Sequence, residues 1–281
     1  MIVAGSHSQT LAAALAGETG EELASVEYDR FPDGEGIVRV EDIEGRAVVV
    51  ASTVSDRAHV ELLQLQDAVR EAGASEVTTV LPYMGYARQD RAFESGQPVS
   101  ARAVARAIST GTDRVITVNP HESRICDYFD VPAEALDAAA CLARPLPEDL
   151  VDPLFIAPDD NALGIAETVA DAYGRGETDY FEKHRRSGTE VEITPSDAAV
   201  EGRDVVLVDD IVATGTTMSE SVAVLDDRDA SRVFVTCVHP LLARDATLKL
   251  ARAGVEGIYA TDTVERSVTE VSVAPTVADA L

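Results

Sequence analysis

The chain has 281 residues, enough for two domains of ordinary size, and 46% of them are hydrophobic, which is typical of a globular protein. Its formal net charge is −27 at pH 7, which argues against a nucleic-acid-binding surface. It contains no run of about 18 apolar residues, so the sequence predicts no membrane-spanning helix. Residues 1–5 lack the basic region of a signal peptide, and we expect a buried strand there.

The cysteines and lysines are both scarce. Cys126, Cys141 and Cys237 form no Cys-x-x-Cys motif, which indicates buried thiols in a reducing, cytoplasmic compartment. The only lysines are Lys183 and Lys249, and the acidic residues are spread over the whole chain. Such a composition predicts a halophilic source, because concentrated salt screens the repulsion between the acidic groups. A polyphosphate substrate would need local donors and a metal ion, because the overall field repels it.

Apolar runs and helical patterns alternate along the chain. In the first half we expect strands at residues 1–5, 24–28, 37–40, 47–51, 77–81 and 114–118, and helices at 58–72 and 100–109. In the second half we expect strands at residues 154–157, 205–208 and 232–238, and helices at 162–172 and 219–225. This alternation predicts an α/β fold in which mainly parallel sheets carry helices on both faces.

The proline-containing segment at residues 143–149 predicts the boundary between two domains. We therefore expect domains at residues 1–142 and 143–281. Residues 269–281, about the last thirteen of the chain, are candidates to pack back on the first domain.

The most informative segment follows the predicted strand at residues 205–208. The strand ends in Asp209 and Asp210, and a loop of small and hydroxyl-bearing residues leads into the next helix: Ala213, Thr214, Gly215, Thr216 and Thr217. Amides at a helix N-terminus bind phosphate, hydroxyls add donors, and carboxylates accept hydrogen bonds from ribose. The segment predicts a sugar-phosphate site. The alternative is an ordinary strand-to-helix turn with an acidic cap.

Two polar segments of the first half follow strand-like runs, where ligands bind in open parallel sheets. Residues 31–35, Phe-Pro-Asp-Gly-Glu, predict a turn between two strands. Residues 83–91 combine two tyrosines with Arg88, Gln89 and Arg91, side chains that suit a base and phosphate oxygens. A solvated loop is the alternative for this second segment.

Further polar residues follow strands at corresponding places in the two halves. His121 and Asp159 each stand between a strand and a helix, and suit a divalent cation that is held mainly by phosphates. Helix capping is their alternative role. Lys183 and Arg185 lie in the most basic segment of the chain. A flexible ammonium there can follow charge on a transferring phosphoryl group, and a solvated charge run is the alternative.

These segments, in this order, resemble those of the ribose-phosphate pyrophosphokinase family over nearly the whole chain. The resemblance implies two tandem type I phosphoribosyltransferase-like domains, an active site between them, and a homodimer or higher homo-oligomer. It implies an ATP site, a ribose-5-phosphate site, a Mg²⁺ site and a catalytic loop. Their residues would be Phe31, Asp33, Gly34, Glu35, Arg88 and Gln89 for ATP; Arg185, Asp209, Asp210 and residues 213–217 for ribose 5-phosphate; His121 and Asp159 for Mg²⁺; and Lys183 and Arg185 for catalysis.

The implied reaction transfers the β,γ-pyrophosphoryl group of ATP to the anomeric hydroxyl of ribose 5-phosphate, for nucleotide biosynthesis. A phosphoribosyltransferase is one alternative, but it would need only one such domain and would leave Arg88 and Lys183 unexplained. A non-catalytic regulatory relative is the other. The family's loop commonly has Asp or Ser at Ala213 and glycine at Thr216. If the loop needed positive φ at Thr216, this β-branched residue would weaken binding.

Overall fold

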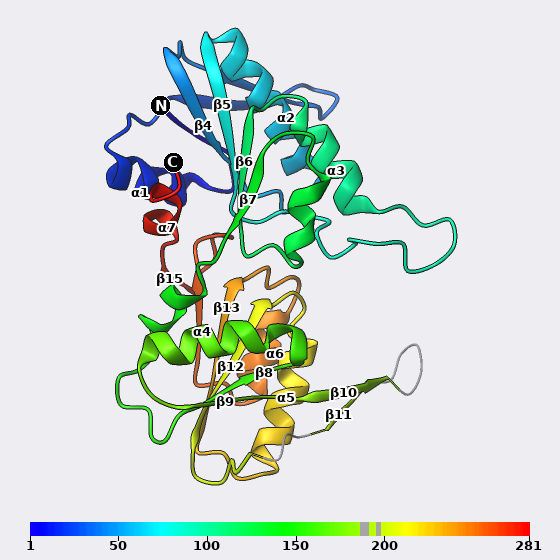
Figure 1. Ribbon diagram of the computed structural model, residues 1–281, viewed down its shortest axis with the longest axis vertical. Helices are drawn as coiled ribbons and strands as arrows, with labels where there is room; N and C mark the ends of the chain where they lie inside the picture. Colours follow the sequence, from blue (N-terminus) through cyan, green and yellow to red (C-terminus); the bar gives the residue numbers. More distant parts are fainter. Residues whose placement is uncertain (186–190, 195–197) are drawn as a thin grey trace. The chain divides into compact units, whose positions relative to one another are not determined.

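Figure 1 shows the computed structural model of the chain. It describes residues 1–185, 191–194 and 198–281, with the backbone alone at 183–185 and 191–194. Contacts divide the chain into two compact units: residues 1–137, 262–265 and 272–281 form unit 1, and residues 138–261 and 266–271 form unit 2. The domain boundary expected between residues 142 and 143 stays a prediction.

Unit 1 is built on a parallel five-stranded sheet. Its strands, in spatial order, are β1 (Ile2–Ala4), β4 (Gly45–Val50), β5 (Ala74–Leu81), β6 (Arg114–Val118) and β7 (Ala133–Leu136). The helices are α1 (Gln9–Thr19), α2 (Asp56–Glu71), α3 (Ser100–Ser109), the 3₁₀ helix η1 (Ser123–Tyr128) and α7 (Ala274–Ala278). Val48, Val49 and Val50 are fully buried, as expected for a strand covered on both faces.

The helices of unit 1 cover the sheet from two sides. Leu62 and Leu65 of α2 share a core with Ala47 and Val49 of β4. Helices α1 and α7 pack against each other and lie on the other side of the sheet from α2 and α3 in Figure 1. An antiparallel hairpin, β2 (Val26–Arg30) and β3 (Gly36–Val40), packs on α2, where Gln64 Nε2 donates to the Gly36 carbonyl at 2.9 Å.

Unit 2 is built on a parallel six-stranded sheet. Its strands, in spatial order, are β15 (Thr269–Val271), β14 (Gly257–Thr261), β13 (Arg232–His239), β12 (Asp204–Ile211), β8 (Leu154–Ala157) and β9 (Glu177–Tyr180). Strands β10 (Glu182–Arg185) and β11 (Val191–Thr194) form a separate antiparallel ladder. The helices are η2 (Ala139–Ala143), η3 (Asp160–Ala162), α4 (Leu163–Tyr173), α5 (Thr216–Asp226) and α6 (Ala246–Arg252).

The strand order of unit 2 reverses direction between β8 and β12. After β8 the chain adds β9 on one side, and it then returns to add β12 and β13 on the other side. The connections after β8 and β12 therefore diverge, and ligands bind beside the carboxyl ends of the strands at such a switch point. Met218 and Val222 of α5 share a core with Leu154 and Leu207. The topology thus places a site next to the residues that follow β8 and β12.

The predicted α/β fold with mainly parallel sheets is confirmed. The helix expected at residues 100–109 is α3, and the strand expected at 154–157 is β8. Helix α5 begins at Thr216, earlier than the start expected at Ser219. Within the described part of the chain, no helix is both long enough and apolar enough to span a membrane.

Candidate active site

Strand β12 passes into α5 through a tight turn at Gly215. Gly215 has φ 70°, in the left-handed region, and is the residue just before the helix. A Cβ added there would lie 3.3 Å from the Ala246 carbonyl oxygen and 3.4 Å from Leu250 Cγ, so α6 packs closely on the turn. Glycine is favoured here by its backbone conformation.

Thr216 does not need the freedom of glycine. It is the first residue of α5 and is not among the residues with positive φ. In this loop the residue with positive φ is Gly215. The β-branched side chain of Thr216 is therefore compatible with the fold of the loop.

The loop at residues 213–217 presents hydroxyls and amides together. Thr214 Oγ1 and Thr216 Oγ1 lie 3.3 Å apart, and Ser219 Oγ donates to the Thr216 carbonyl at 2.8 Å. The first amides of α5 have no acceptor within the helix, and the helix dipole adds positive potential there. This arrangement can bind a phosphate group.

Lys249 also contacts this loop, which the residue pattern around it did not predict. Its Nζ donates to the Thr214 carbonyl at 3.1 Å and to Thr216 Oγ1 at 2.9 Å, from helix α6. The signal in the sequence is the scarcity of lysine, because the chain has only Lys183 and Lys249.

Carboxylates gather where β8 and β12 end. Asp159 follows β8 and caps η3, where its Oδ1 accepts from the Asn161 amide at 3.2 Å. Asp209 and Asp210 lie at the end of β12, and the Asp210 amide donates to Asp209 Oδ1 at 2.9 Å. Burial raises the pKa of Asp209 well above its usual value, and the charges of Asp210 and Asp159 raise it further. Carboxylates at this edge can accept hydrogen bonds from the hydroxyls of a ligand.

In unit 1, the structure links two predicted segments. Arg88 is exposed and Gln89 is half-buried in the loop after β5, and the neighbouring Asp90 is buried. Asp90 pairs with Arg124, and its carbonyl accepts from Tyr128 Oη at 2.7 Å. Both partners belong to η1, which begins shortly after the exposed His121. The Arg88–Gln89 segment and the His121 segment are therefore held together at the ends of β5 and β6.

Residues 31–35 form the turn of the β2–β3 hairpin, as expected. The Phe31 amide donates to the Glu35 carbonyl at 2.8 Å, and the Glu35 amide donates to Asp33 Oδ1 at 3.1 Å. Gly34 has φ 97°, and Phe31 is 48% exposed. Within the described part of the chain, these bonds tie the turn to itself and leave the Phe31 ring available to a ligand or partner.

Lys183 and Arg185 lie on β10, in register with Ile193 and Val191 of β11. Only their backbone is described, so the predicted roles of their side chains lie outside what the structure describes.

The described residues include no group of three or more His, Cys, Asp or Glu side chains arranged to hold a metal ion. His121 belongs to unit 1 and Asp159 to unit 2. A Mg²⁺ ion bound to one or two protein groups and to the phosphates of its nucleotide would not require such a group.

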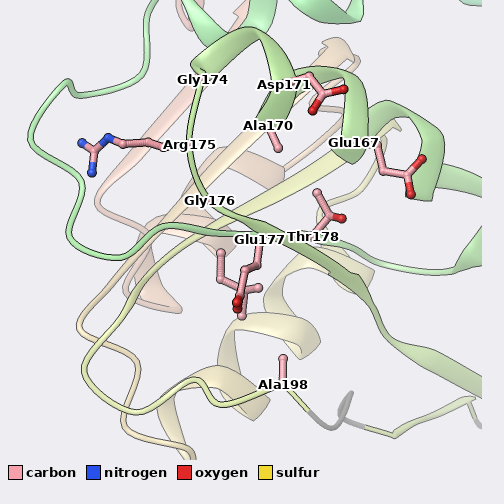
Figure 2. A pocket seen from close by; sticks show the side chains of 10 residues that line it. Glu167, Ala170, Asp171, Gly174, Arg175, Gly176, Glu177, Thr178 and Ala198 are labelled. Carbon is pink, nitrogen blue, oxygen red and sulfur yellow. The ribbon is translucent and has the colours of Figure 1, made fainter.

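A hollow in unit 2 lies away from this chemistry. It measures about 810 Å³ and is lined by Leu154, Glu167, Ala170, Asp171, Gly174, Arg175, Gly176, Glu177, Thr178 and Ala198 (Figure 2). Leu154 and Glu177 are the first residues of β8 and β9, and Gly174 ends α4. The hollow is therefore at the amino ends of these strands, opposite the edge where parallel sheets bind their ligands.

Comparisons with known proteins cover the whole chain. The family described as the N-terminal domain of ribose phosphate pyrophosphokinase matches residues 1–111, and the phosphoribosyl transferase domain family matches residues 128–275. A ribose-phosphate pyrophosphokinase of Halobacterium salinarum is 64% identical over 100% of both chains. The chain belongs to the ribose-phosphate pyrophosphokinase family.

Two further relatives agree with this assignment. A ribose-phosphate pyrophosphokinase of Methanosarcina mazei is 47% identical over 100% of this chain and 94% of its own length. The crystal structure of phosphoribosylpyrophosphate synthetase from Mycobacterium smegmatis matches with a TM-score of 0.84 and 27% identity, over 100% of this chain and 96% of that one. The predicted family, fold class and enzyme activity are confirmed, and a separate phosphoribosyltransferase is not favoured.

Proposed function

We propose that the chain transfers the β,γ-pyrophosphoryl group of ATP to O1 of ribose 5-phosphate, giving 5-phosphoribosyl 1-pyrophosphate and AMP. The observation that carries this proposal is the end of β12, where Asp209 and Asp210 precede a loop and helix N-terminus suited to a sugar phosphate. The full-length likeness to ribose-phosphate pyrophosphokinases supports the same reaction.

Ribose 5-phosphate binds with its phosphate on the 213–217 loop. The amides at the start of α5 and the hydroxyls of Thr214 and Thr216 donate to the phosphate oxygens. Asp209 and Asp210 accept hydrogen bonds from the ribose hydroxyls. Because the loop holds one end of the sugar and the acids hold the ring, the anomeric hydroxyl is presented in a fixed orientation.

ATP is bound by the residues that the family resemblance singles out. Arg88 and Gln89 contact the phosphates, and the turn at residues 31–35 receives the adenosine, with Phe31 against the base. The exposure of Arg88 and Phe31 supports these roles, because both side chains remain accessible to a ligand.

The chemical step is an in-line displacement at the β-phosphorus. The anomeric oxygen forms the new bond to the β-phosphorus and loses its proton to water, while the bond from the β-phosphorus to the α,β-bridging oxygen breaks and AMP departs. Lys183 and Arg185 neutralise charge that develops on the transferring group.

A Mg²⁺ ion fits this reaction. His121 and Asp159 are the residues that the family resemblance assigns to it, together with the nucleotide's phosphates. When bound, Mg²⁺ neutralises phosphate charge, which an acidic protein otherwise repels.

The functional assembly is a homodimer or a larger homo-oligomer. Ile37 and Val60 are large apolar side chains with 40% and 54% exposure. Ile37 and Val60 also line a common small hollow between β3 and α2. Exposed apolar groups of this kind support a surface that a second copy covers.

The deciding experiment measures AMP release from ATP in molar KCl with Mg²⁺, with and without ribose 5-phosphate. Ribose without phosphate is the matched control substrate. We expect AMP release that depends on ribose 5-phosphate and falls by about 10²–10³ in Lys183→Ala, as for the loss of one electrostatic contact in the transition state. No sugar-dependent AMP from folded protein would contradict the proposed function, and normal turnover in Lys183→Ala would contradict the role of Lys183.

A further inference from the structure

Helix α6 presents one face to the sugar-phosphate loop. Ala246 and Leu250 lie against the turn at Gly215, where an added Cβ would come within 3.3 Å of the Ala246 carbonyl oxygen. Lys249 stands beside Leu250 and reaches Thr214 and Thr216 with two hydrogen bonds of 3.1 and 2.9 Å. Because the neighbouring residues of α6 are packed on the turn, the position of the Lys249 ammonium is set by the fold.

The partners of Lys249 show what the ammonium does for the loop. A carbonyl oxygen repels phosphate, and the bond from Nζ to the Thr214 carbonyl neutralises that acceptor. An ammonium has three donors, and Thr214 and Thr216 use two of them, so one remains for another acceptor. The positive charge of Lys249 also lies beside the loop that would bind the phosphate dianion, which a chain of net charge −27 would otherwise repel.

We propose that Lys249 is a positioning residue of the sugar-phosphate site. It holds Thr214 and Thr216 in the arrangement that receives the 5-phosphate, and it supplies the positive charge that balances this group. This inference rests on the part of the proposed function that assigns ribose 5-phosphate to the 213–217 loop.

The test compares two variants of one helix. Lys249→Met removes the ammonium and keeps most of the side chain's length. Arg252→Met removes a positive charge from the last turn of α6 at an exposed position, and serves as the matched control. Titration calorimetry in molar KCl then measures the binding of ribose 5-phosphate, inorganic phosphate and ATP separately, and thermal unfolding is recorded for each protein.

We expect Lys249→Met to weaken the binding of ribose 5-phosphate and inorganic phosphate by about 10- to 100-fold, the usual effect of losing a charged hydrogen-bonding partner. The Kd for ATP and the Tm should stay at their wild-type values, and Arg252→Met should bind all three ligands like the wild type. In turnover assays, the loss in Lys249→Met should appear in the KM for ribose 5-phosphate.

Two results would overturn the inference. One is wild-type affinity for ribose 5-phosphate in Lys249→Met. The other is an equal loss for ATP together with a lower Tm, which would mean a general structural role. The wild type could bind ribose 5-phosphate more tightly than Lys249→Met and still release no AMP. That result would support the role of Lys249 and contradict the proposed reaction, so failure of the inference and failure of the proposed function can be told apart.

Discussion

Gly215 and Lys249 show how single residues make a phosphate loop in an acidic chain. Gly215 provides the positive φ of 70° that turns β12 into α5, and its missing Cβ allows α6 to approach. That approach brings Lys249 to the loop. The structure and charge of the loop therefore depend on α6, a helix that follows it by some thirty residues. The same helix both packs on Gly215 and supplies the ammonium of Lys249.

At the residue scale, Asp204 is expected to stabilise unit 2 in a pH-dependent way. Its carboxylate is fully buried and accepts from Arg232 Nε at 3.0 Å and from the Val151 amide at 2.6 Å. Burial acts to raise the pKa of Asp204, but the bonds from Arg232 and Val151 outweigh it and lower that pKa. Asp204→Asn should lower the free energy of unfolding by about 1–3 kcal/mol at pH 7, measured by urea denaturation in molar KCl.

The pH dependence follows from the direction of this shift. Because the pKa of Asp204 is lower in the folded state, its stabilisation is present above the ordinary aspartate pKa of about 3.9 and is lost as the pH falls through the folded-state value. The difference between wild type and Asp204→Asn should therefore shrink in acid. Glu256→Gln, at an exposed position of the same unit, is the control and should change little. A difference that stays constant with pH would argue against this account.

At the scale of elements, helix α7 completes the first unit although it ends the chain. Val273, Ala274 and Val277 are fully buried, and α7 packs on α1. Arg46 Nη1 donates to the Leu281 carbonyl at 2.9 Å, and Arg114 Nη2 donates to the Ala280 carbonyl at 3.0 Å. Both apolar burial and charged hydrogen bonds hold this short helix, which is too short to be stable alone.

We expect Val277→Ala to lower the free energy of unfolding of unit 1 by about 2 kcal/mol, because it removes buried methyl groups and leaves a cavity. Calorimetric unfolding would measure the change. Leu23→Ala is the control, since Leu23 is in the same unit but 46% exposed. Equal effects of the two substitutions would mean that α7 contributes little to the stability of unit 1.

At the scale of the whole molecule, the net charge of −27 governs the conditions under which the fold is stable. The range of charge repulsion falls from about 10 Å at 0.1 M salt to about 3 Å at 1 M. We expect Tm to rise steadily between 0.1 M and molar KCl, as measured by thermal unfolding. The rise should shrink as the pH approaches the sequence pI of about 4.4, where the net charge approaches zero. A Tm that is independent of salt at pH 7 would contradict the prediction of a halophilic protein.

Elements with a strong local pattern were predictable from the chain alone. Helix α3 (Ser100–Ser109) and strand β8 (Leu154–Ala157) lie where periodicity placed them, because their buried residues recur with the spacing of a helix or form one apolar run. Strands β7 (Ala133–Leu136) and β9 (Glu177–Tyr180) were missed. Both are edge strands whose side chains are half-buried or exposed, so no apolar run marks them.

The α/β class and the sugar-phosphate loop could be inferred from residue types and their spacing, because strand ends and phosphate loops carry local signatures. The family was inferred from the resemblance of the polar segments, in their order, to those of known members. The contact of Lys249 with Thr214 and the packing of α7 on α1 in particular could not be inferred in this way, although residues 269–281 were candidates to pack back on the first domain. Each joins residues far apart in the sequence, and nothing local fixes such a pair. Tertiary packing determines which of these distant residues meet. Helix α6 packs against Gly215 and α7 packs against α1 because those surfaces bury apolar area together.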